Sequence, residues 1–417
     1  MTGLGPDLPM AVATSSIRFI THSPPAPGIS GDRIRVFNLM RELKRRGWIV
    51  RLWSLVAPDE PEGFRDALDA VADEVVMVPR DISTGRRLGR LARDVVTGQA
   101  FQAHWFWSRE GARAAAGWLA DAADEPIFVE QLYMYPVVPV RLRGRILLDT
   151  QNHEAARMTA IARGEGGLGR RLVARLQGGA VERYERGALG SVGRVLAVSA
   201  AEARAFEAMA PGRVRVVPNG VDVGAITAAS TPIASRQVLF LGSLGYSANR
   251  DAVRHFTRDI APLLAGSGIT LAVVGSNPDG SMHDAAAHAA VPVTIAGFVP
   301  DIGPYFSTSR AMVVPLRHGA GTRLKILEAL AWGLPVVTTS MGGDGLGLVN
   351  GRHALIADEP SAFAAAVESV VRDDVLWARL SRAGRALVEE RFGWPQIGAV
   401  LDEAAREIGG RTPVAGT

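Results

Sequence analysis

The sequence has no cysteine, almost no lysine and no long apolar run, and each absence excludes a class of protein. Without cysteine, the chain of 417 residues has no disulfide, thiolate nucleophile, iron–sulfur cluster or cysteine-bound zinc. No stretch reaches about 18 consecutive apolar residues, the least that a membrane-spanning helix needs. The first residues also lack the basic and apolar parts of a signal peptide. We therefore expect a folded cytoplasmic protein.

The positive charge of the chain is carried by 44 arginines and two lysines, Lys44 and Lys325. The formal net charge of +4 is too small to indicate nucleic-acid binding. This charge is unevenly placed, since residues 1–230 carry a net +5 and residues 231–417 a net −1. The N-terminal half is therefore the basic half of the protein.

The most basic segment, 156–194, contains eight arginines and three glutamates. Leu168, Leu172, Leu176 and Val173 would fall on one side of a helix there, with arginines beside them. We favour a helix that packs these leucines on its own sheet and leaves its arginines in water. The alternative is a surface that docks on anionic lipid or on a lipid-linked acceptor.

Short β-rich runs alternate with helical patterns along almost the whole chain. Strands are expected at 17–21, 49–55, 127–129, 146–149, 195–198 and 214–217, and then at 238–241, 271–274, 293–295, 312–314, 336–339 and 354–356. Helices are expected at 33–46, 201–209, 251–264, 323–332, 362–371 and 374–391. This alternation predicts an α/β fold with parallel sheets and helices on both faces. Twelve strands in two sets of six favour two domains.

The domain boundary favoured by composition is 223–236, a link of small residues and proline that follows an Asn-Gly turn. We therefore predict an N-terminal Rossmann-like domain over 1–225 and a second over 236–392. The remaining segment, 393–417, is expected to hold a helix that crosses back to the first domain. Ligands of such folds bind beyond the carboxyl ends of the strands, in the cleft between the two domains.

The clearest candidate site is a strand, a glycine loop and a helix in direct succession. Gly319 and Gly321 allow the backbone to approach a phosphate closely, just before the positive end of the helix. Arg323 and Lys325 add two cations where the helix dipole disfavours them, which indicates an anion nearby. Glu328 shares a helix face with Lys325 and can accept both hydroxyls of a ribose. The pattern favours a nucleoside-diphosphate site over a surface ion pair without a ligand.

Two stretches, GTRLKILEALAWGLPVV and PNGVD, carry a family resemblance. The chain resembles the retaining, nucleotide-sugar-dependent glycosyltransferases of family 4, which have the GT-B fold, and the resemblance covers nearly its whole length. It implies two Rossmann-like domains whose parallel sheets face across a cleft. It also implies that a sugar passes from a nucleoside diphosphate to an acceptor with retention of anomeric configuration, without a metal or a cofactor. The lack of any Asp-x-Asp motif fits this class, and the lack of a well-formed G-x-G-x-x-G after a strand weighs against a nicotinamide dehydrogenase.

The resemblance also assigns roles in the second domain. Arg323 and Lys325 would neutralise the departing diphosphate, and Glu328 would hold the ribose. Further donor contacts are expected from residues of the glycine loops and strand ends, namely Gly319, Gly321, Thr322, Gly342, Gly343, Asp344 and Ser243. Of these, Gly342 and Gly343 would donate backbone N–H groups, and Asp344 would accept a sugar hydroxyl.

The chain departs from the family pattern at two places. The family's Glu-x7-Glu signature needs a glutamate where this chain has Ala320. The arginine and lysine that often follow the first strand of the second domain are replaced by Ser243 and Asn249. We expect Asn249 and Asp251 to cap the helix that begins there. Compensation of the diphosphate charge then falls to the cations after the glycine loop.

Two loops of the N-terminal domain are candidates for the same site. Gly28 and Gly31 would let the backbone approach the donor phosphate and the acceptor, and Arg33 could reach an anion. An ordinary βα turn is the alternative. His153 is our choice for the side chain that faces the donor sugar, and the other side chains of the same loop that stay open are Asp149, Gln151 and Glu154.

Two further features are interpreted as structural. The aromatic run Trp105, Phe106 and Trp107 is expected to pack in the core or a domain interface rather than to form a sugar platform. Ser199 is expected to cap a helix, with Glu202 completing the capping box.

The sequence thus predicts a glycosyltransferase of polysaccharide or glycoconjugate biosynthesis. Its partners would be a nucleotide-sugar donor and a glycan or lipid-linked acceptor, and nucleic acid is not expected. The basic N-terminal domain would make peripheral contact with the inner face of the membrane. A catalytically silent GT-B binding protein and a nucleotide-sugar epimerase of related fold remain open alternatives.

Overall fold

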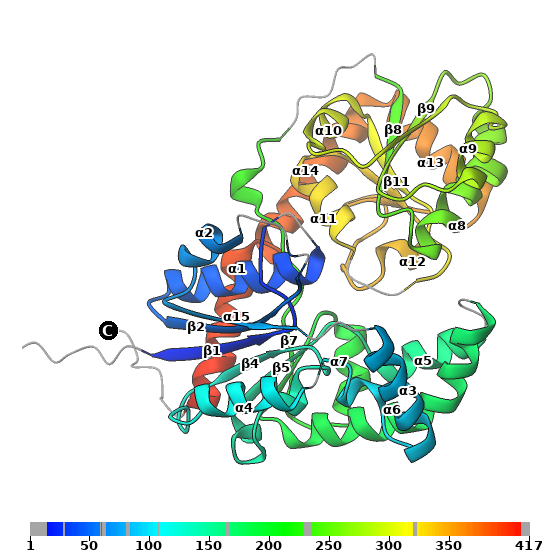
Figure 1. Ribbon diagram of the computed structural model, residues 1–417. Helices are drawn as coiled ribbons and strands as arrows, with labels where there is room; N and C mark the ends of the chain where they lie inside the picture. Colours follow the sequence, from blue (N-terminus) through cyan, green and yellow to red (C-terminus); the bar gives the residue numbers. More distant parts are fainter. Residues whose placement is uncertain are drawn as a thin grey trace, which may run out of the picture. The chain divides into compact units, whose positions relative to one another are not determined.

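The structure is a computed structural model that describes residues 15–27, 30–58, 60, 64–80, 84–106, 108–163, 167–228, 235–319 and 323–409 (Figure 1). The chain divides into two compact units. Unit 1 comprises the described residues up to Ala197, together with Ala203–Arg215 and the C-terminal segment from Gly398. Unit 2 comprises Val198–Glu202 and Val216–Ile397.

Unit 1 is built on a seven-stranded sheet in the order β3-β2-β1-β4-β5-β6-β7. Its strands are β1 (Ser16–Thr21), β2 (Ile49–Val56), β3 (Glu74–Pro79), β4 (Ile127–Glu130), β5 (Ile146–Thr150), β6 (Arg194–Ala197) and β7 (Val214–Val216). The pairings of β1 to β6, whose registers are described, are all parallel. The order reverses between β1 and β4, which makes the carboxyl ends of these two strands a topological switch point.

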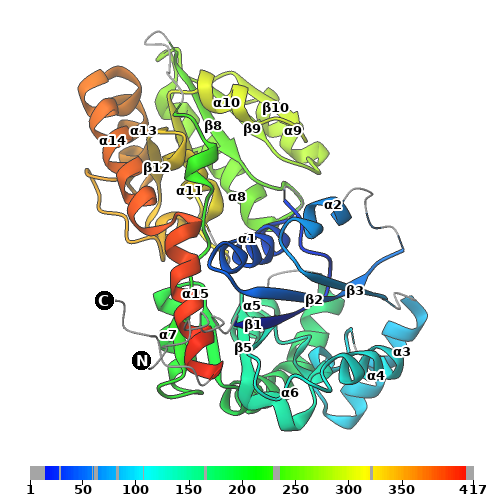
Figure 2. The ribbon, with the colours of Figure 1, turned by 90° about the vertical axis from the view of Figure 1, so that its left-hand side faces the viewer.

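The helices of unit 1 cover both faces of this sheet, as Figure 2 shows for α1 on one side and α4 and α6 on the other. They are α1 (Gly31–Arg45), α2 (Phe64–Asp69), α3 (Thr84–Thr97), α4 (Arg109–Trp118), α5 (Glu154–Arg163), α6 (Leu168–Ser191) and α7 (Ala200–Glu207), with short 3-10 turns η1 (Phe101–Ala103), η2 (Tyr135–Val137) and η3 (Val140–Arg145). The last helix, α15 (Trp394–Gly409), belongs to unit 1 from Gly398 onward. There Trp48 Nε1 donates to Asp402 at 2.7 Å and Arg145 Nη1 to the carbonyl of Ile408 at 2.5 Å.

Unit 2 is built on a six-stranded parallel sheet in the order β10-β9-β8-β11-β12-β13. Its strands are β8 (Gln237–Leu241), β9 (Thr270–Val274), β10 (Val293–Gly297), β11 (Ala311–Val314), β12 (Val336–Thr338) and β13 (Leu355–Ile356). Here the order reverses between β8 and β11. Both β11 and β12 are buried over their whole length, as strands covered on both faces must be.

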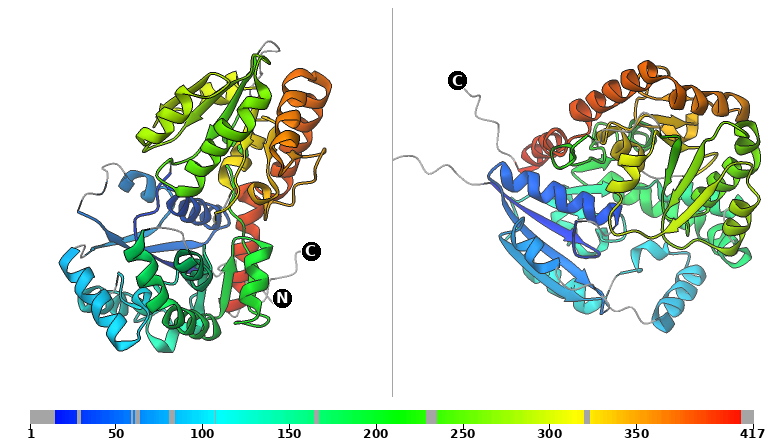
Figure 3. Two further views of the ribbon diagram at one scale, coloured as in Figure 1. Left: turned by 90° about the vertical axis from the view of Figure 1, so that its right-hand side faces the viewer. Right: turned by 90° about the horizontal axis from the view of Figure 1, so that it is seen from above.

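The helices of unit 2 are α8 (Ser247–His255), α9 (Gly280–Ala287), α10 (Gly303–Thr308), α11 (Leu324–Ala331), α12 (Ser340–Gly343), α13 (Pro360–Arg372) and α14 (Asp374–Arg391). Helix α8 runs on through a π turn, Phe256–Ile260, and a 3-10 turn, Ala261–Leu264. Helix α14 packs against α11 and α13, and Figure 3 shows α13 and α14 side by side in orange. Helix α11 ends before Gly333, whose φ of 71° reverses the chain toward β12.

All twelve expected strands are present, and the structure adds β3. This strand lies at the edge of the sheet and is only partly buried, although its apolar run, residues 75–78, is as long as those of the central strands. The chain enters unit 2 at Val216, before the expected link, because Val221 already packs in the core of unit 2. Its backbone N–H donates to the carbonyl of Phe392 at 2.9 Å.

The favoured interpretation of the leucine stripe is wrong. Leu168, Leu172 and Leu176 are 82, 58 and 57% exposed, so they do not pack on the sheet. Helix α6 instead buries a side that includes Ala174, Ala180 and Val181 and that packs against α5. Within the described part of the chain, no helix has both the length and the apolarity to cross a membrane.

Candidate active site

The candidate site of unit 2 lies at the carboxyl ends of β8, β11 and β12, beside the switch point of the sheet. Three segments meet there: the loop after β8, the Gly319 loop after β11, and α12 after β12. A Cβ on Gly319 would lie 2.8 Å from Ala248 Cβ and 2.9 Å from the Tyr246 hydroxyl, so only glycine fits between the first two segments. The φ of Gly319, 114°, also favours glycine.

Arg323 is the N-cap residue of α11 and is 8% exposed. Its Nη2 donates to the carbonyl oxygens of Gly319 and Met341, each at 3.0 Å. Its Nε is buried without a hydrogen-bond partner, and no carboxylate of a described residue lies within ion-pair distance. Burial lowers the pKa of the guanidinium, and the charges of Tyr246 and Asp344 only partly oppose this. Arg323 is thus a buried cation whose charge no described residue matches with an ion pair, as an anion site requires.

A cavity of about 210 Å³ borders Arg323 and is lined entirely by residues of unit 2. Gly319 and Arg323 form one wall, and the segment after β12 contributes Met341, Asp344 and Gly345. The other walls come from the two short segments at the start of unit 2, with Val198, Ser199, Ala201, Glu202, Pro218 and Asn219. Predicted site residues from two separate loops therefore border one cavity.

Lys325 points toward the loop after β8. Its Nζ donates to Asn249 Oδ1 at 2.8 Å and lies 4.7 Å from the ring centre of Phe240. A Cβ on Gly242 would lie 2.5 Å from this Nζ, so glycine leaves room for the ammonium. Burial lowers the pKa of Lys325 to about 7, the charge of Arg323 adds to the effect, and Glu328 opposes it. The ammonium is therefore easily deprotonated unless an anion is near.

Glu328 lies one helical turn beyond Lys325, and its carboxylate makes no hydrogen bond or ion pair with any residue that the structure describes. Burial raises its pKa to about 7, and the charge of Lys325 opposes this rise. A half-buried carboxyl without a protein partner is available to a ligand.

The expected capping of α8 by Asn249 and Asp251 is wrong. The N-cap residue is Tyr246, and it makes no side-chain cap bond. Asn249 instead links the two sides of the site, because its Nδ2 donates to the carbonyl of Ser243 at 2.8 Å while its Oδ1 accepts from Lys325. Asp251 pairs with Arg317. The Oγ of Ser243 lies 3.4 Å from that of Ser276.

The expected role of Gly342 and Gly343 as backbone donors to the sugar nucleotide stays a prediction. The N–H of Gly342 donates to Thr339 Oγ1 at 2.9 Å, and the N–H of Gly343 donates to the Thr339 carbonyl at 3.0 Å. Both groups are thus used within α12. The glycines are needed for packing, since a Cβ on Gly342 would lie 2.2 Å from Thr338 Oγ1. Asp344, just beyond, does line the cavity.

Four residues of the expected loops, Gly28, Ala320, Gly321 and Thr322, lie outside the described residues. Gly31 is the exposed first residue of α1. Arg33, which we expect to reach an anion, is 7% exposed and is hydrogen-bonded and ion-paired within unit 1. Its Nε donates to the carbonyl of Pro24 at 2.6 Å, and its Nη1 pairs with Glu60 at 2.5 Å.

The side chains after β5 differ in their surroundings. Asp149 is fully buried and paired with Arg35 at 2.7 Å, which gives it a structural role. Gln151 donates to Asp149 at 3.3 Å. His153 lies 3.4 Å from Glu185 and packs its ring edge-to-face on Phe206, and burial lowers its pKa. The carboxylate of Glu185 accepts the N–H groups of Glu154 and Ala155 and so caps α5.

A cluster that the sequence does not single out lies at the switch point of unit 1. His22, directly after β1, pairs with Glu130 at the end of β4 at 2.9 Å and with Asp32 at 3.5 Å. One ligand atom from each lies within 4.8 Å of the others, a spacing that a metal ion could bridge. Burial would lower the pKa of His22, but the charges of Glu130 and Asp32 outweigh it and raise that pKa. An imidazolium between two carboxylates accounts for the cluster. Phe106 stacks on His22 at 5.1 Å.

Residues 235–373, most of unit 2, match the family described as "Glycosyl transferases group 1". The glycogen synthase of Mycobacterium tuberculosis is 28% identical over 224 residues, which are 50% of this chain and 52% of that protein. The D-inositol 3-phosphate glycosyltransferase of Paenarthrobacter aurescens is 32% identical over 110 residues, 26% of each chain. The chain thus spans about half the length of the first curated relative, and a quarter of the second.

Solved structures share the fold over nearly the whole chain. Sucrose-phosphate synthase from Thermosynechococcus elongatus superposes with a TM-score of 0.67 at 17% identity, covering 95% of this chain and 100% of that one. The Anabaena protein HepE, in complex with UDP and glucose, superposes with a TM-score of 0.61 at 16% identity, covering 94 and 100%. The expected fold class, GT-B with two Rossmann-like parallel-sheet domains, is confirmed, and the matches in sequence support a transferase enzyme.

Proposed function

We propose that this protein is a retaining glycosyltransferase of family 4, which transfers a sugar from a nucleoside-diphosphate sugar to an acceptor. The observation that carries the proposal is the buried Arg323, which has no ion pair among the described residues and borders a cavity at the switch point of the sheet. The matched family segment contains this residue, so sequence similarity and local geometry point to the same place.

Three residues of unit 2 would each bind a different part of the donor. Arg323 would bind the diphosphate with its free Nε–H and stabilise the charge that develops as the sugar leaves. Lys325 would take up a proton when the diphosphate arrives and add a second cation. Glu328 would accept hydrogen bonds from the ribose hydroxyls, since it has no protein partner among the described residues.

The transfer itself would take place on one face of the sugar. The bond between the anomeric carbon and the diphosphate oxygen breaks, and the bond to the acceptor oxygen forms on the same side. The acceptor proton passes to the departing phosphate oxygen, so no protein nucleophile is required. Cationic side chains supply the charge compensation, so we propose that the reaction uses no metal and no cofactor besides the co-substrate.

A uridine donor is the first choice to test, because HepE was solved in complexes with UDP and with UDP-glucose. The acceptor would be a glycan or a lipid-linked sugar of polysaccharide or glycoconjugate biosynthesis. We place the protein in the cytoplasm, with the basic N-terminal part of the chain in contact with the inner face of the membrane.

The test combines binding with turnover. UDP at 100 times its Kd should stabilise the wild type by about 2.7 kcal/mol, and Arg323→Ala and Lys325→Ala should abolish most of this stabilisation. Arg317→Ala is the matched control, because Arg317 lies in the same loop but is 44% exposed and paired with Asp251. Incubation with UDP-glucose and acceptor extracts then separates the functions. Sugar transfer supports the proposal, binding without any turnover indicates a silent binding protein, and isomerised donor without an acceptor indicates an epimerase.

A further inference from the structure

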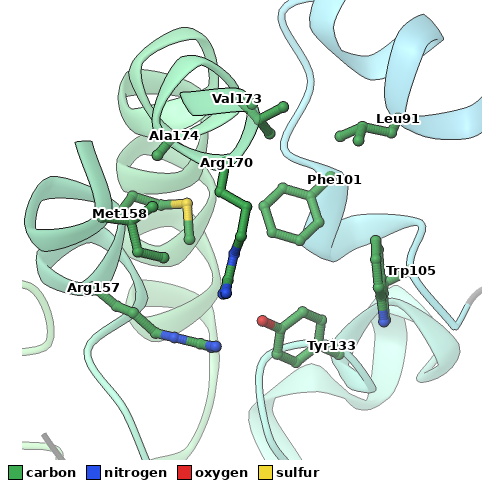
Figure 4. A pocket seen from close by; sticks show the side chains of 11 residues that line it. Leu91, Phe101, Trp105, Tyr133, Arg157, Met158, Arg170, Val173 and Ala174 are labelled. Carbon is green, nitrogen blue, oxygen red and sulfur yellow. The ribbon is translucent and has the colours of Figure 1, made fainter. Parts of the chain in front are cut away.

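Unit 1 contains a second cavity, of about 420 Å³, between α3, η1, α5 and α6. Its volume is in the range of small-molecule sites. Figure 4 shows its side chains, and its walls are mainly apolar, formed by Leu91, Phe101, Trp105, Met158, Ile161 and Val173. Trp105, expected in the core or an interface, thus lines a cavity, with its ring edge-to-face to Phe101 at 5.5 Å.

The polar groups of this cavity are cationic. Figure 4 shows the ends of Arg157 and Arg170 and the hydroxyl of Tyr133 directed toward the same region of the pocket. Arg157 lies 3.5 Å from Glu154, whose carboxylate also accepts from Tyr133 at 3.1 Å. Arg170 is exposed and has neither an ion pair nor a side-chain hydrogen bond among the described residues. The lining residues that the structure describes thus include two guanidinium groups and no carboxylate, and of the two only Arg157 is paired, so this lining carries a net positive charge.

The surface around the pocket is both apolar and basic. The two helices that form its outer walls, α3 and α6, leave large apolar side chains in water: Leu88, Val96, Leu168, Leu172 and Leu176 are 57 to 86% exposed. Arginines alternate with them along both helices. Helices that combine exposed leucines with arginines are typical of binding at the surface of an anionic bilayer.

We infer that this pocket binds a lipid phosphate, a long hydrocarbon chain that ends in a phosphate. The chain would lie between Phe101, Met158 and Val173, and the phosphate oxygens would accept hydrogen bonds from Arg157 and Arg170. Sugars and free nucleotides fit this pocket less well, because its walls offer few hydrogen-bond partners. The inference rests on the proposed function in one respect: the lipid phosphate would be the carrier of the sugar acceptor.

Calorimetric titration with decyl phosphate and farnesyl phosphate, kept below their micelle concentrations, tests the pocket. Both should bind at least about tenfold more tightly than inorganic phosphate, since burying a few methylene groups is worth that much. Uncharged 1-decanol should bind more weakly than decyl phosphate. Vesicles of phosphatidylcholine with and without phosphatidylglycerol distinguish the source of the ligand. Binding to the vesicles but not to the single-chain phosphates would overturn the pocket in favour of a surface contact.

Two variants and a control locate the site. Arg170→Gln should weaken binding of decyl phosphate by about tenfold or more, the usual effect of losing a hydrogen bond to a charged group. Val173→Trp should block the chain without changing the charge. Arg171→Gln removes the same charge from the neighbouring position of α6, outside the lining, and should change the affinity by less than about twofold. Equal losses in Arg170→Gln and Arg171→Gln would overturn the inference.

Titration of the same proteins with UDP keeps the two proposals apart. UDP binding should be unchanged in Arg170→Gln and Val173→Trp, because Arg323 and its cavity belong to unit 2. Lipid phosphate binding without any UDP binding would contradict the proposed glycosyltransferase function and support the lipid site. UDP binding and sugar transfer without any lipid phosphate binding would contradict the lipid site and support the proposed enzyme function.

Discussion

The pKa of Lys325 leads to a quantitative prediction for donor binding. In the unliganded protein, burial lowers this pKa from 10.5 to about 7. A bound diphosphate would raise it again, because the negative charge favours the ammonium form. Binding therefore takes up a proton wherever Lys325 is neutral in the free protein, and the affinity for UDP must fall as the pH rises above 7.

The size of this effect follows from the protonated fraction of Lys325. With a pKa of about 7, that fraction drops from about one quarter at pH 7.5 to about one hundredth at pH 9, so UDP should bind about 25-fold more weakly at pH 9. Two other groups that could affect UDP binding are mostly ionised between pH 7.5 and pH 9. Glu328, with its pKa raised to about 7, is mostly ionised throughout this range, and the phosphates of UDP, with a second pKa of about 6, are fully ionised.

The assay is calorimetric titration of UDP at pH 7.5, 8.25 and 9, in two buffers of different ionisation enthalpy. The difference between the buffers measures proton uptake, which should approach one proton per UDP at the upper end. Lys325→Met keeps the length of the side chain without its charge, and should bind UDP weakly with little dependence on pH. The reasoning is refuted if the wild type has the same affinity across this window, or if Lys325→Met retains its pH dependence.

Three further predictions concern individual contacts. Asn249→Leu removes the hydrogen-bond acceptor of the Lys325 ammonium, so it should lower the pKa of Lys325 further. The fall in UDP affinity should then move to lower pH in titrations from pH 6 to 8. An unchanged pH profile would exclude the contact at 2.8 Å between Lys325 and Asn249. Gly342→Ala places a Cβ 2.8 Å from the Val314 carbonyl and closer still to Thr338. It should therefore lower the free energy of unfolding in urea by about 1–3 kcal/mol. The control Gly85→Ala, at an exposed glycine, should be nearly neutral. Arg35→Met leaves the buried Asp149 without its cationic partner and should cost about 3–5 kcal/mol of stability. The double variant Arg35→Met with Asp149→Leu should recover most of this loss, and no recovery would argue against a purely structural pair.

The sheets were predictable because parallel strands covered on both faces are continuous apolar runs. Strands β11 and β12 are of this kind and were located within a residue or two. Strand β3, which lies at an edge and is only partly buried, was not predicted although its residues 75–78 are an apolar run of similar length. The interpretation of the leucine stripe was wrong because periodicity identifies an apolar helix face but does not show whether another element covers it. Helix α6 packs its alanine side on α5 instead.

The candidate site was predictable where one short segment carries the chemistry. Arg323, Lys325 and Glu328 lie on one helix, and the pattern of glycine, cation and carboxylate was sufficient to single them out. Contacts between distant segments were not predictable. Asn249 meets Lys325 from 76 positions away, and an asparagine at the start of a helix is more often a cap.

Ser199 illustrates the same limit of local patterns. Its Oγ accepts the N–H of Glu202 at 3.2 Å, as the expected cap requires, yet both residues also line the cavity beside Arg323. Their place in that cavity is set by the crossing of Val198–Glu202 into unit 2, a feature of the tertiary fold that leaves no local pattern in the sequence.

The measurement that tests the central claim most directly is a calorimetric titration of UDP into the wild type, Arg323→Ala and Arg317→Ala at pH 7.5. We expect one UDP site per chain in the wild type, a loss of affinity of about tenfold or more in Arg323→Ala, and nearly wild-type affinity in Arg317→Ala. Wild-type affinity in Arg323→Ala would contradict the account, because the unmatched charge of Arg323 would then have no part in holding the nucleotide.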